Sequence, residues 1–391
     1  MDTPQFKNIL FLGMGGGNDV FSTLLAAKSL WNIGWRWQEA FLGGVLSPFH
    51  EYTDLIDYGY GAWWTRPEST RFLVRMHERR KISFVDAKVA ELVRENRPLN
   101  ISGVLGFSLE EGSIGMADAL MHARDNFDYV VLVDVGGDCF YRGAQDTHVI
   151  SPMFDSMVLR GFLDSGKPGI LFEAGPGTDG EMDPEVLQDI LRQASAVPFP
   201  LKPGVMDWWA QNYRIWIAPV RTGNTVPRTI EAFASGEKEV QYPHRVRAHM
   251  GSTRLYTSFT QRVWPALCKY FYLVKPEAIH NPFAVECRFP EDWFIQTQVH
   301  QHRTCCEANL EYTRIMGKQC QFLTPAPLFP LADQQAIIAQ GLQELEQGIC
   351  DAALMFPRDW ETVTLERRNQ FWVLSQPGLR GLAWVQPKRR L

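Results

Sequence analysis

Hydrophobic residues in the first half of the chain recur in short runs that alternate with amphipathic segments. Residues 9–12 are apolar and lead into a glycine cluster, and residues 20–31 follow with helical spacing and without Gly or Pro. This order predicts a strand, a glycine turn and a helix. The same reading predicts strands at 41–46, 81–86, 101–107, 129–133 and 168–172, and helices at 87–95, 116–124, 153–163 and 184–194. Such alternation indicates a doubly wound α/β fold with a mostly parallel sheet.

The regular pattern weakens after a proline-rich stretch at 197–203. We therefore predict two parts: an α/β core with a ligand crevice at 1–200, and a less regular C-terminal α+β region at 201–391 that packs on the core or completes it. In the second part, residues 267–274 resemble a strand, and helices are expected at 293–312 and 334–346.

Composition narrows the functional class. The formal net charge of −5 gives no general attraction to nucleic acid or to an anionic membrane. No apolar run approaches the roughly 18 residues that a membrane span needs. Seven cysteines, an odd number scattered along the chain, do not resemble a secreted disulfide framework. We expect a cytoplasmic protein without nucleic-acid or membrane partners, and the oligomeric state stays open, a homo-oligomer included.

Three glycine-bearing turns, at 13–19, 134–138 and 175–181, each follow a predicted strand. The carboxyl ends of parallel strands share one edge of a sheet, so these turns should converge on a polar or anionic small-molecule ligand. The alternative is structural: glycines permit tight turns, and Asp residues cap helices. The candidate substrate-binding residues are Gly15, Gly16, Gly17, Asn18, Asp19, Gly136, Gly137, Gly175, Gly177, Asp179 and Glu181.

The first turn is not a standard nucleotide motif. It begins like a dinucleotide fingerprint, but Asn18 stands where the third glycine should be. The strand at 41–46 ends in Ser47-Pro48, without the acidic residue that would hold a ribose. NAD or FAD binding is therefore not expected. No Lys-Ser or Lys-Thr pair directly follows the glycines at P-loop spacing, which excludes a P-loop NTPase.

Asp134 and Asp138, separated by Val-Gly-Gly, are the candidate catalytic and metal-binding pair. Two close carboxylates are unfavourable unless a cation neutralises them or they share a proton. Oxygen ligands suit Mg²⁺ or Ca²⁺, and Asp146 and Asp155 could join or support the cluster. The alternative is a hydrogen-bonding network that holds a polar ligand directly. His148 is the histidine best placed for proton transfer and is the third catalytic candidate.

Four of these segments carry a family resemblance. They are Gly-Gly-Gly-Asn-Asp-Val at 15–20, Val-Asp-Val-Gly-Gly-Asp at 133–138, Ser-Pro-Met-Phe-Asp at 151–155 and Gly-Pro-Gly-Thr-Asp-Gly-Glu at 175–181. In this order they resemble the signatures of the domain of unknown function 1152 (DUF1152) family, over roughly residues 6–380. The resemblance implies a Rossmann-like α/β fold and attaches no activity.

The leading functional hypothesis is a cytoplasmic enzyme of small-molecule metabolism that acts on a polar, anionic or nucleotide-like substrate by hydrolysis or group transfer. Backbone amides at 15–18 would hold the anion at a helix start. Asp134 and Asp138 would position a divalent cation or substrate hydroxyls. The alternative is a non-catalytic metabolite-binding or regulatory protein that uses the same crevice.

Overall fold

The structure, a computed structural model, describes most of the first 281 residues and four short C-terminal segments. The described residues are 4–16, 18–46, 55–59, 62–65, 85–96, 98–108, 112–123, 126–142, 146, 152–219, 224–250, 253–281, 351–353, 364–368, 371–376 and 379–386. The predicted helices at 293–312 and 334–346 lie outside these residues, as do His148 and Gly17.

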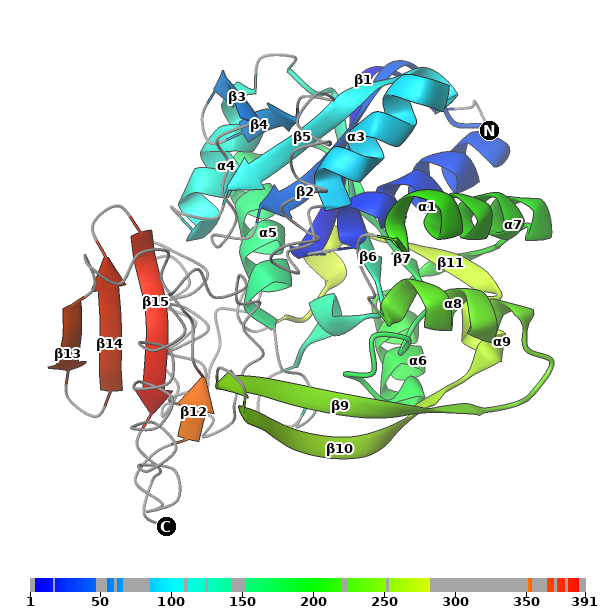
Figure 1. Ribbon diagram of the computed structural model, residues 1–391. Helices are drawn as coiled ribbons and strands as arrows, with labels where there is room; N and C mark the ends of the chain where they lie inside the picture. Colours follow the sequence, from blue (N-terminus) through cyan, green and yellow to red (C-terminus); the bar gives the residue numbers. More distant parts are fainter. Residues whose placement is uncertain are drawn as a thin grey trace.

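A nine-stranded mixed sheet organises the described part of the chain (Figure 1). Its order is β3-β4-β5-β2-β1-β6-β7-β11-β8, and the neighbours β5, β2, β1, β6 and β7 run parallel. The mostly parallel α/β architecture is therefore confirmed. The strands are β1 (Gln5–Gly16), β2 (Arg36–Leu46), β3 (Leu55–Gly59), β4 (Ala62–Thr65), β5 (Ile101–Ser108), β6 (Tyr129–Val135), β7 (Gly169–Ala174), β8 (Val197–Pro200) and β11 (Tyr270–Val274).

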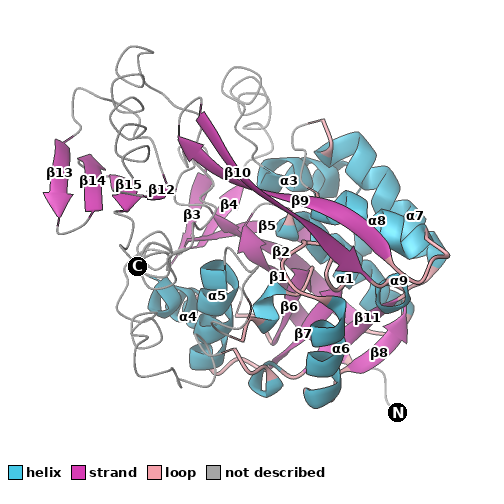
Figure 2. Ribbon diagram, turned by 90° about the horizontal axis from the view of Figure 1, so that it is seen from below, coloured by secondary structure: helices cyan, strands magenta, loops and turns pink. Residues whose placement is uncertain are grey.

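Helices cover both faces of this sheet (Figures 1 and 2). One face packs against α4 (Gly112–His122), α5 (Pro152–Ser165) and α6 (Pro184–Gln193). The other packs against α1 (Asp19–Asn32), α3 (Val85–Asn96), α7 (Pro203–Asn212) and α8 (Thr225–Ala234). The short helix α9 (Pro265–Cys268) leads into β11. No described helix combines the length and the apolar character needed to cross a lipid bilayer.

The alternating side chains of β1 explain why the sheet has helices on both of its faces. Ile9 and Phe11 pack in the cluster beneath α1, whereas Leu10 and Leu12 pack in the cluster beneath α5, and all four are fully buried. Side chains of a strand alternate between faces, so an uninterrupted apolar run is the signature of a strand covered on both sides. Each such side chain contributes about 1.5–3 kcal/mol of transfer free energy.

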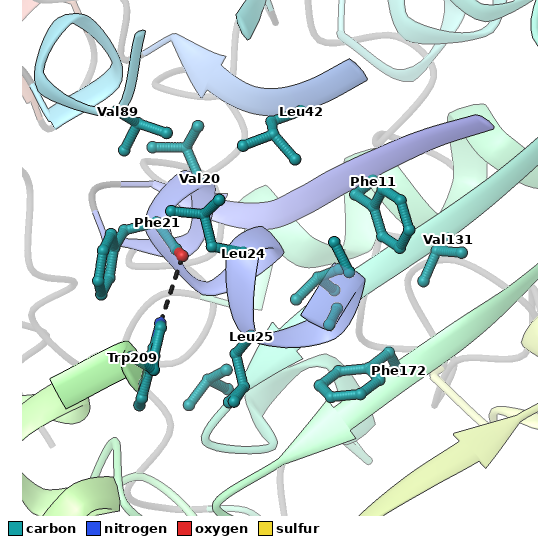
Figure 3. Close-up of a cluster of buried hydrophobic side chains, with 14 of the residues drawn as sticks. Phe11, Val20, Phe21, Leu24, Leu25, Leu42, Val89, Val131, Phe172 and Trp209 are labelled. Carbon is teal, nitrogen blue, oxygen red and sulfur yellow. Dashed lines mark hydrogen bonds between the residues drawn. The ribbon is translucent and has the colours of Figure 1, made fainter. Parts of the chain in front are cut away.

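Helix α1, which follows the glycine turn at 13–19, packs against α7 (Figure 3). The ring of Phe21 stacks on Trp209 of α7 with centroids 5.5 Å apart, and Trp209 Nε1 donates a hydrogen bond of 3.4 Å to the Phe21 carbonyl. Both side chains are fully buried. The position of α1, and therefore of the turn that precedes it, depends on residues beyond 200.

The structure corrects two sequence predictions and adds two strands. Residues 81–86 were expected as an edge strand, but Val85 and Asp86 begin α3, which packs on the sheet through its buried apolar side. The loop expected at 108–115 is shorter, because α4 begins at Gly112. Within residues 50–70, where the hydrophobic pattern has no clear period, β3 and β4 extend the edge of the sheet beside β5.

Beyond residue 200 the chain returns to the same sheet. Strand β11 enters antiparallel between β7 and β8. A two-stranded ribbon of β9 (Val240–Met250) and β10 (Thr253–Val263) precedes it and runs along the lower side of Figure 1. The last described strands form a separate antiparallel sheet of order β12-β15-β14-β13, with β12 (Asp351–Ala353), β13 (Thr364–Arg368), β14 (Phe371–Gln376) and β15 (Leu379–Gln386).

Candidate functional site

The candidate site lies at the carboxyl ends of β1 and β6. These strands are neighbours, with Gly13 opposite Val133. From β1 the chain passes into α1 on one face of the sheet, and from β6 it reaches α5 on the other. Connections that leave in opposite directions open a crevice between the two strand ends, which is where ligands bind in open α/β sheets.

The first turn packs its backbone against Asp19. A Cβ on Gly13 would lie 2.6 Å from the Asp19 carbonyl carbon, so only glycine fits there. A Cβ on Gly15 would overlap the Asp19 carboxylate and lie 3.5 Å from Asp155 Oδ1. Gly15 therefore keeps open the space between two acidic side chains. Asn18 stands before α1 but makes no side-chain cap, which disfavours capping as the reason for this amide.

The second turn brings two carboxylates to one point. Asp134 ends the apolar run of β6, is 2% exposed, and its Oδ2 accepts a 3.3 Å hydrogen bond from the Cys139 amide. Gly136 and Gly137 then take φ values of +136° and +109°, which L side chains rarely adopt, and turn the chain back. Asp138, partly exposed, follows at the start of a 3-10 turn.

The third turn is joined to the second. The Gly177 amide donates a 2.5 Å hydrogen bond to the Gly136 carbonyl. A Cβ on Gly136 would lie 2.6 Å from the Cβ of Asp179, so the two turns touch. Asp179 Oδ1 accepts from the Glu181 amide, whereas Asp179 Oδ2 is buried and accepts no hydrogen bond. Gly175, at φ +62°, begins this turn directly after β7.

Asp155 supplies the third carboxylate of the cluster from the first turn of α5. Carboxylate oxygens of Asp134, Asp138 and Asp155 lie within 4.8 Å of one another, a spacing that could hold a metal ion. Asp155 is 2% exposed, and its Oδ1 has no hydrogen-bond partner. Sequence reasoning left open whether Asp155 joins or only supports the cluster. The geometry makes it an equal member of the group.

Glu173 was missed by sequence reasoning. It lies in β7 directly opposite Asp134 of β6, is fully buried, and neither of its carboxylate oxygens makes a hydrogen bond of ordinary geometry. Together with Asp134 and the thiol of Cys139 it forms a second group of ligand atoms within 4.8 Å of one another. The available signal was a charged residue inside the apolar run Ile-Leu-Phe-Glu-Ala at 170–174.

Burial and crowding raise the pKa values of Asp134, Asp138, Asp155, Glu173 and Asp179. Burial is the largest cause of the raised pKa of Asp134, and repulsion from Asp134 adds to burial in raising the pKa values of Asp138, Asp155 and Glu173 well above the usual range. Burial also raises the pKa of Asp179, to about 7. Carboxylates arranged in this way hold protons unless a cation replaces those protons.

Two hydrogen-bonding systems hold the cluster in place. Asn281 donates through Nδ2 to the Cys139 carbonyl and to Ser156 Oγ, at 3.0 Å each, and so ties the second turn to α5. Arg228 of α8, whose pKa burial lowers, donates to the Asp179 carbonyl at 3.3 Å. Asp146 could have joined the cluster on sequence grounds, but its carboxylate pairs with Arg142 at 2.5 Å.

Part of the chain matches one known protein family. Residues 69–198 match a family described as "Protein of unknown function (DUF1152)". The match includes the second, third and fourth motifs and confirms the resemblance over that span, whereas the first motif and the rest of the expected range 6–380 lie outside it. No curated protein matches the chain at a significant level.

Proposed function

We propose that this chain, whose residues 69–198 are a DUF1152 segment, is an enzyme that uses a divalent cation to hydrolyse or transfer a group of an anionic small molecule. The cation is held by Asp134, Asp138 and Asp155. One observation carries the proposal: Asp155 Oδ1 is buried without a hydrogen bond, in a side chain whose carboxylate lies within 4.8 Å of those of Asp134 and Asp138. Burying an unpaired carboxylate is unfavourable by several kcal/mol, and a cation removes that cost.

The spacing suits a hard cation. Oxygens on opposite sides of Ca²⁺ are about 4.6–5.2 Å apart, given bonds of about 2.3–2.6 Å, and about 4.2 Å apart on Mg²⁺. The three carboxylate oxygens lie within 4.8 Å of one another, which is compatible with a shared Ca²⁺ or Mg²⁺ ion. Asp138, the partly exposed member, leaves one side of the site open to a substrate.

Groups next to the carboxylate cluster are suited to bind an anionic substrate and to act on it. The start of α1 presents backbone amides beside the carboxylates, and an anion is stabilised there by the helix dipole. A divalent cation would supply positive charge against the substrate oxygen on which negative charge develops. Asp179, with a pKa of about 7 and a free Oδ2, is suited to transfer a proton near neutral pH.

The order of the parallel strands supports a Rossmann-like assignment. Numbered along the chain, β5, β2, β1, β6 and β7 are the third, second, first, fourth and fifth parallel strands of the sheet. This is the order of dinucleotide-binding folds, and the candidate site lies where that order reverses. A cytoplasmic location follows from the composition argument and remains part of the proposal.

Metal binding is tested by thermal unfolding of the full chain after treatment with EDTA. Saturating Ca²⁺ or Mg²⁺ at about 100 times Kd should stabilise the wild type by about 2.7 kcal/mol. Asp155→Asn should lose this stabilisation. Asp164→Asn is the matched control, because Asp164 lies on the same helix, at the surface, paired with Arg160. Equal stabilisation of all three proteins would contradict the metal site.

The rival function is a sensor that binds a metabolite in the same crevice without turnover. Incubating the protein with a pool of metabolites and following the pool by mass spectrometry separates the two. An enzyme should deplete one compound and form another, and Asp138→Asn should abolish the change. If the wild type binds a compound but leaves the pool unchanged, the sensor is correct.

A further inference from the structure

Asp134 belongs to two groups of potential ligands. On its outer side are Asp138 and Asp155, already assigned to the proposed cation. On its inner side are Cys139 and Glu173, whose Sγ and carboxylate oxygen lie within 4.8 Å of each other and of an Asp134 oxygen. All three inner side chains are buried, at 0% exposure for Cys139 and Glu173 and 2% for Asp134.

The buried carboxylate of Glu173, which lacks a hydrogen bond of ordinary geometry, is the independent observation that points to a ligand. Both of its oxygens are buried and neither makes a hydrogen bond of ordinary geometry. Burial has the largest effect on the pKa of Glu173, and the Asp134 carboxyl and the Gly136 amide beside it also act on that pKa. The parallel register of β6 and β7 holds it opposite Asp134, so its nearest charged neighbour is also acidic. A carboxylate in this position is costly unless a cation lies between the pair or the pair shares a proton.

We propose that Asp134, Cys139 and Glu173 bind a second divalent cation, which Asp134 bridges to the first. This inference rests on the proposed function, because Asp134 serves both sites. A thiol beside two carboxylates selects Zn²⁺, Co²⁺ or Fe²⁺ over Mg²⁺ and Ca²⁺. On binding, the cation forms a bond to Cys139 Sγ, and the thiol proton passes to the solvent.

The two sites therefore differ in the metal that they prefer. The outer site offers only oxygen and has a partly exposed member, Asp138. The inner site offers a sulfur ligand, and its three side chains are buried. Its cation would therefore reach it from the side of the partly exposed Asp138. Two cations that share one carboxylate stabilise the attacking and leaving oxygens of a displacement together. This arrangement narrows the proposed reaction to hydrolysis or transfer at a phosphoryl or acyl centre.

Cobalt tests the inner site, because a cobalt–thiolate bond absorbs in the near ultraviolet and a cobalt–carboxylate bond does not. The full chain, stripped with EDTA, is titrated with Co²⁺ while bound metal and absorbance are measured together. The wild type should bind two ions and show the band. Asp155→Asn should bind one ion and keep the band, whereas Cys139→Ser should bind one ion and lose it.

Two further variants sharpen the result. Glu173→Gln keeps the thiol and the shape of the side chain, and should weaken the band-forming step at least tenfold. Cys268→Ser removes the other buried thiol of the described core, which contacts the Pro176 carbonyl, and should leave the band unchanged.

The outcomes separate this inference from the proposed function. Co²⁺ bound without a thiolate band overturns the inner site and leaves the outer one standing. No bound Co²⁺ also overturns the inner site, and the outer site is then decided by its stabilisation with Ca²⁺ or Mg²⁺. A band that persists in Cys139→Ser, disappears in Cys268→Ser, or keeps its affinity in Glu173→Gln overturns the ligand set, and leaves a shared proton as the explanation of the Asp134 and Glu173 pair.

Discussion

Gly136 is the residue whose replacement tests the joining of the second and third turns. Its φ of +136° is rarely adopted by L side chains, and a Cβ would lie 2.6 Å from the Asp179 Cβ and 2.7 Å from its Cγ. Gly166 is the matched control: its φ is +64°, and a Cβ there would meet nothing within 4 Å. Both substitutions to Ala carry backbone strain. Only Gly136→Ala adds steric overlap.

The structure gives the expected magnitudes. Backbone strain alone should cost Gly166→Ala about 1–2 kcal/mol. Overlap with a buried side chain adds about 1–3 kcal/mol, so Gly136→Ala should lose roughly 2–5 kcal/mol of unfolding free energy. With a urea m-value of about 3 kcal/mol/M, the midpoint of Gly136→Ala should fall by about 1 M.

Urea unfolding followed by tryptophan fluorescence and circular dichroism measures this difference, provided that the two signals change together. The buried Trp209 supplies an intrinsic reporter from the core. If Gly136→Ala loses no more stability than Gly166→Ala, Gly136 does not touch Asp179, and the site described above is assembled incorrectly.

Three further predictions concern the core and its ionisable groups. Trp209→Ala should lose about 3–5 kcal/mol of unfolding free energy in urea, and Trp209→Phe, which keeps the stacking and loses the hydrogen bond, should lose less; equal losses would contradict the stacked geometry. Burial raises the pKa of Asp179 from 3.8 to about 7, so the folded state binds the proton more tightly and stability should fall as pH rises from about 4 to 7. Urea midpoints in EDTA should show this slope, and Asp179→Asn should reduce it; an unchanged slope would refute the assignment. Burial raises the pKa values of Cys139 and Cys268, the latter to about 12. Both thiols should therefore react with iodoacetamide at pH 8 much more slowly in the folded chain than in urea, as measured by peptide mapping. Equal rates would refute their burial.

The sequence alone determined the α/β class, most core strands and the three glycine turns. These features are local: a doubly buried strand is a short apolar run such as 129–133, and a tight turn between strand and helix needs glycine whatever lies elsewhere. Since parallel strands end at one edge, the convergence of Asp134 and Asp179 also followed from the pattern. The proposed roles of His148 and Gly17, outside the described residues, stay predictions.

Only the tertiary structure decided which acidic side chains lie together in the cluster around Asp134. Asp155 comes from a helix and Glu173 from the interior of a strand, and their distances to Asp134 depend on the β6–β7 register and the packing of α5. The entry of β11 between β7 and β8 likewise depends on pairing across a long stretch of chain. Periodicity reports which face of an element is buried. It does not report which side chains of different elements meet, because that depends on contacts between residues far apart in the sequence.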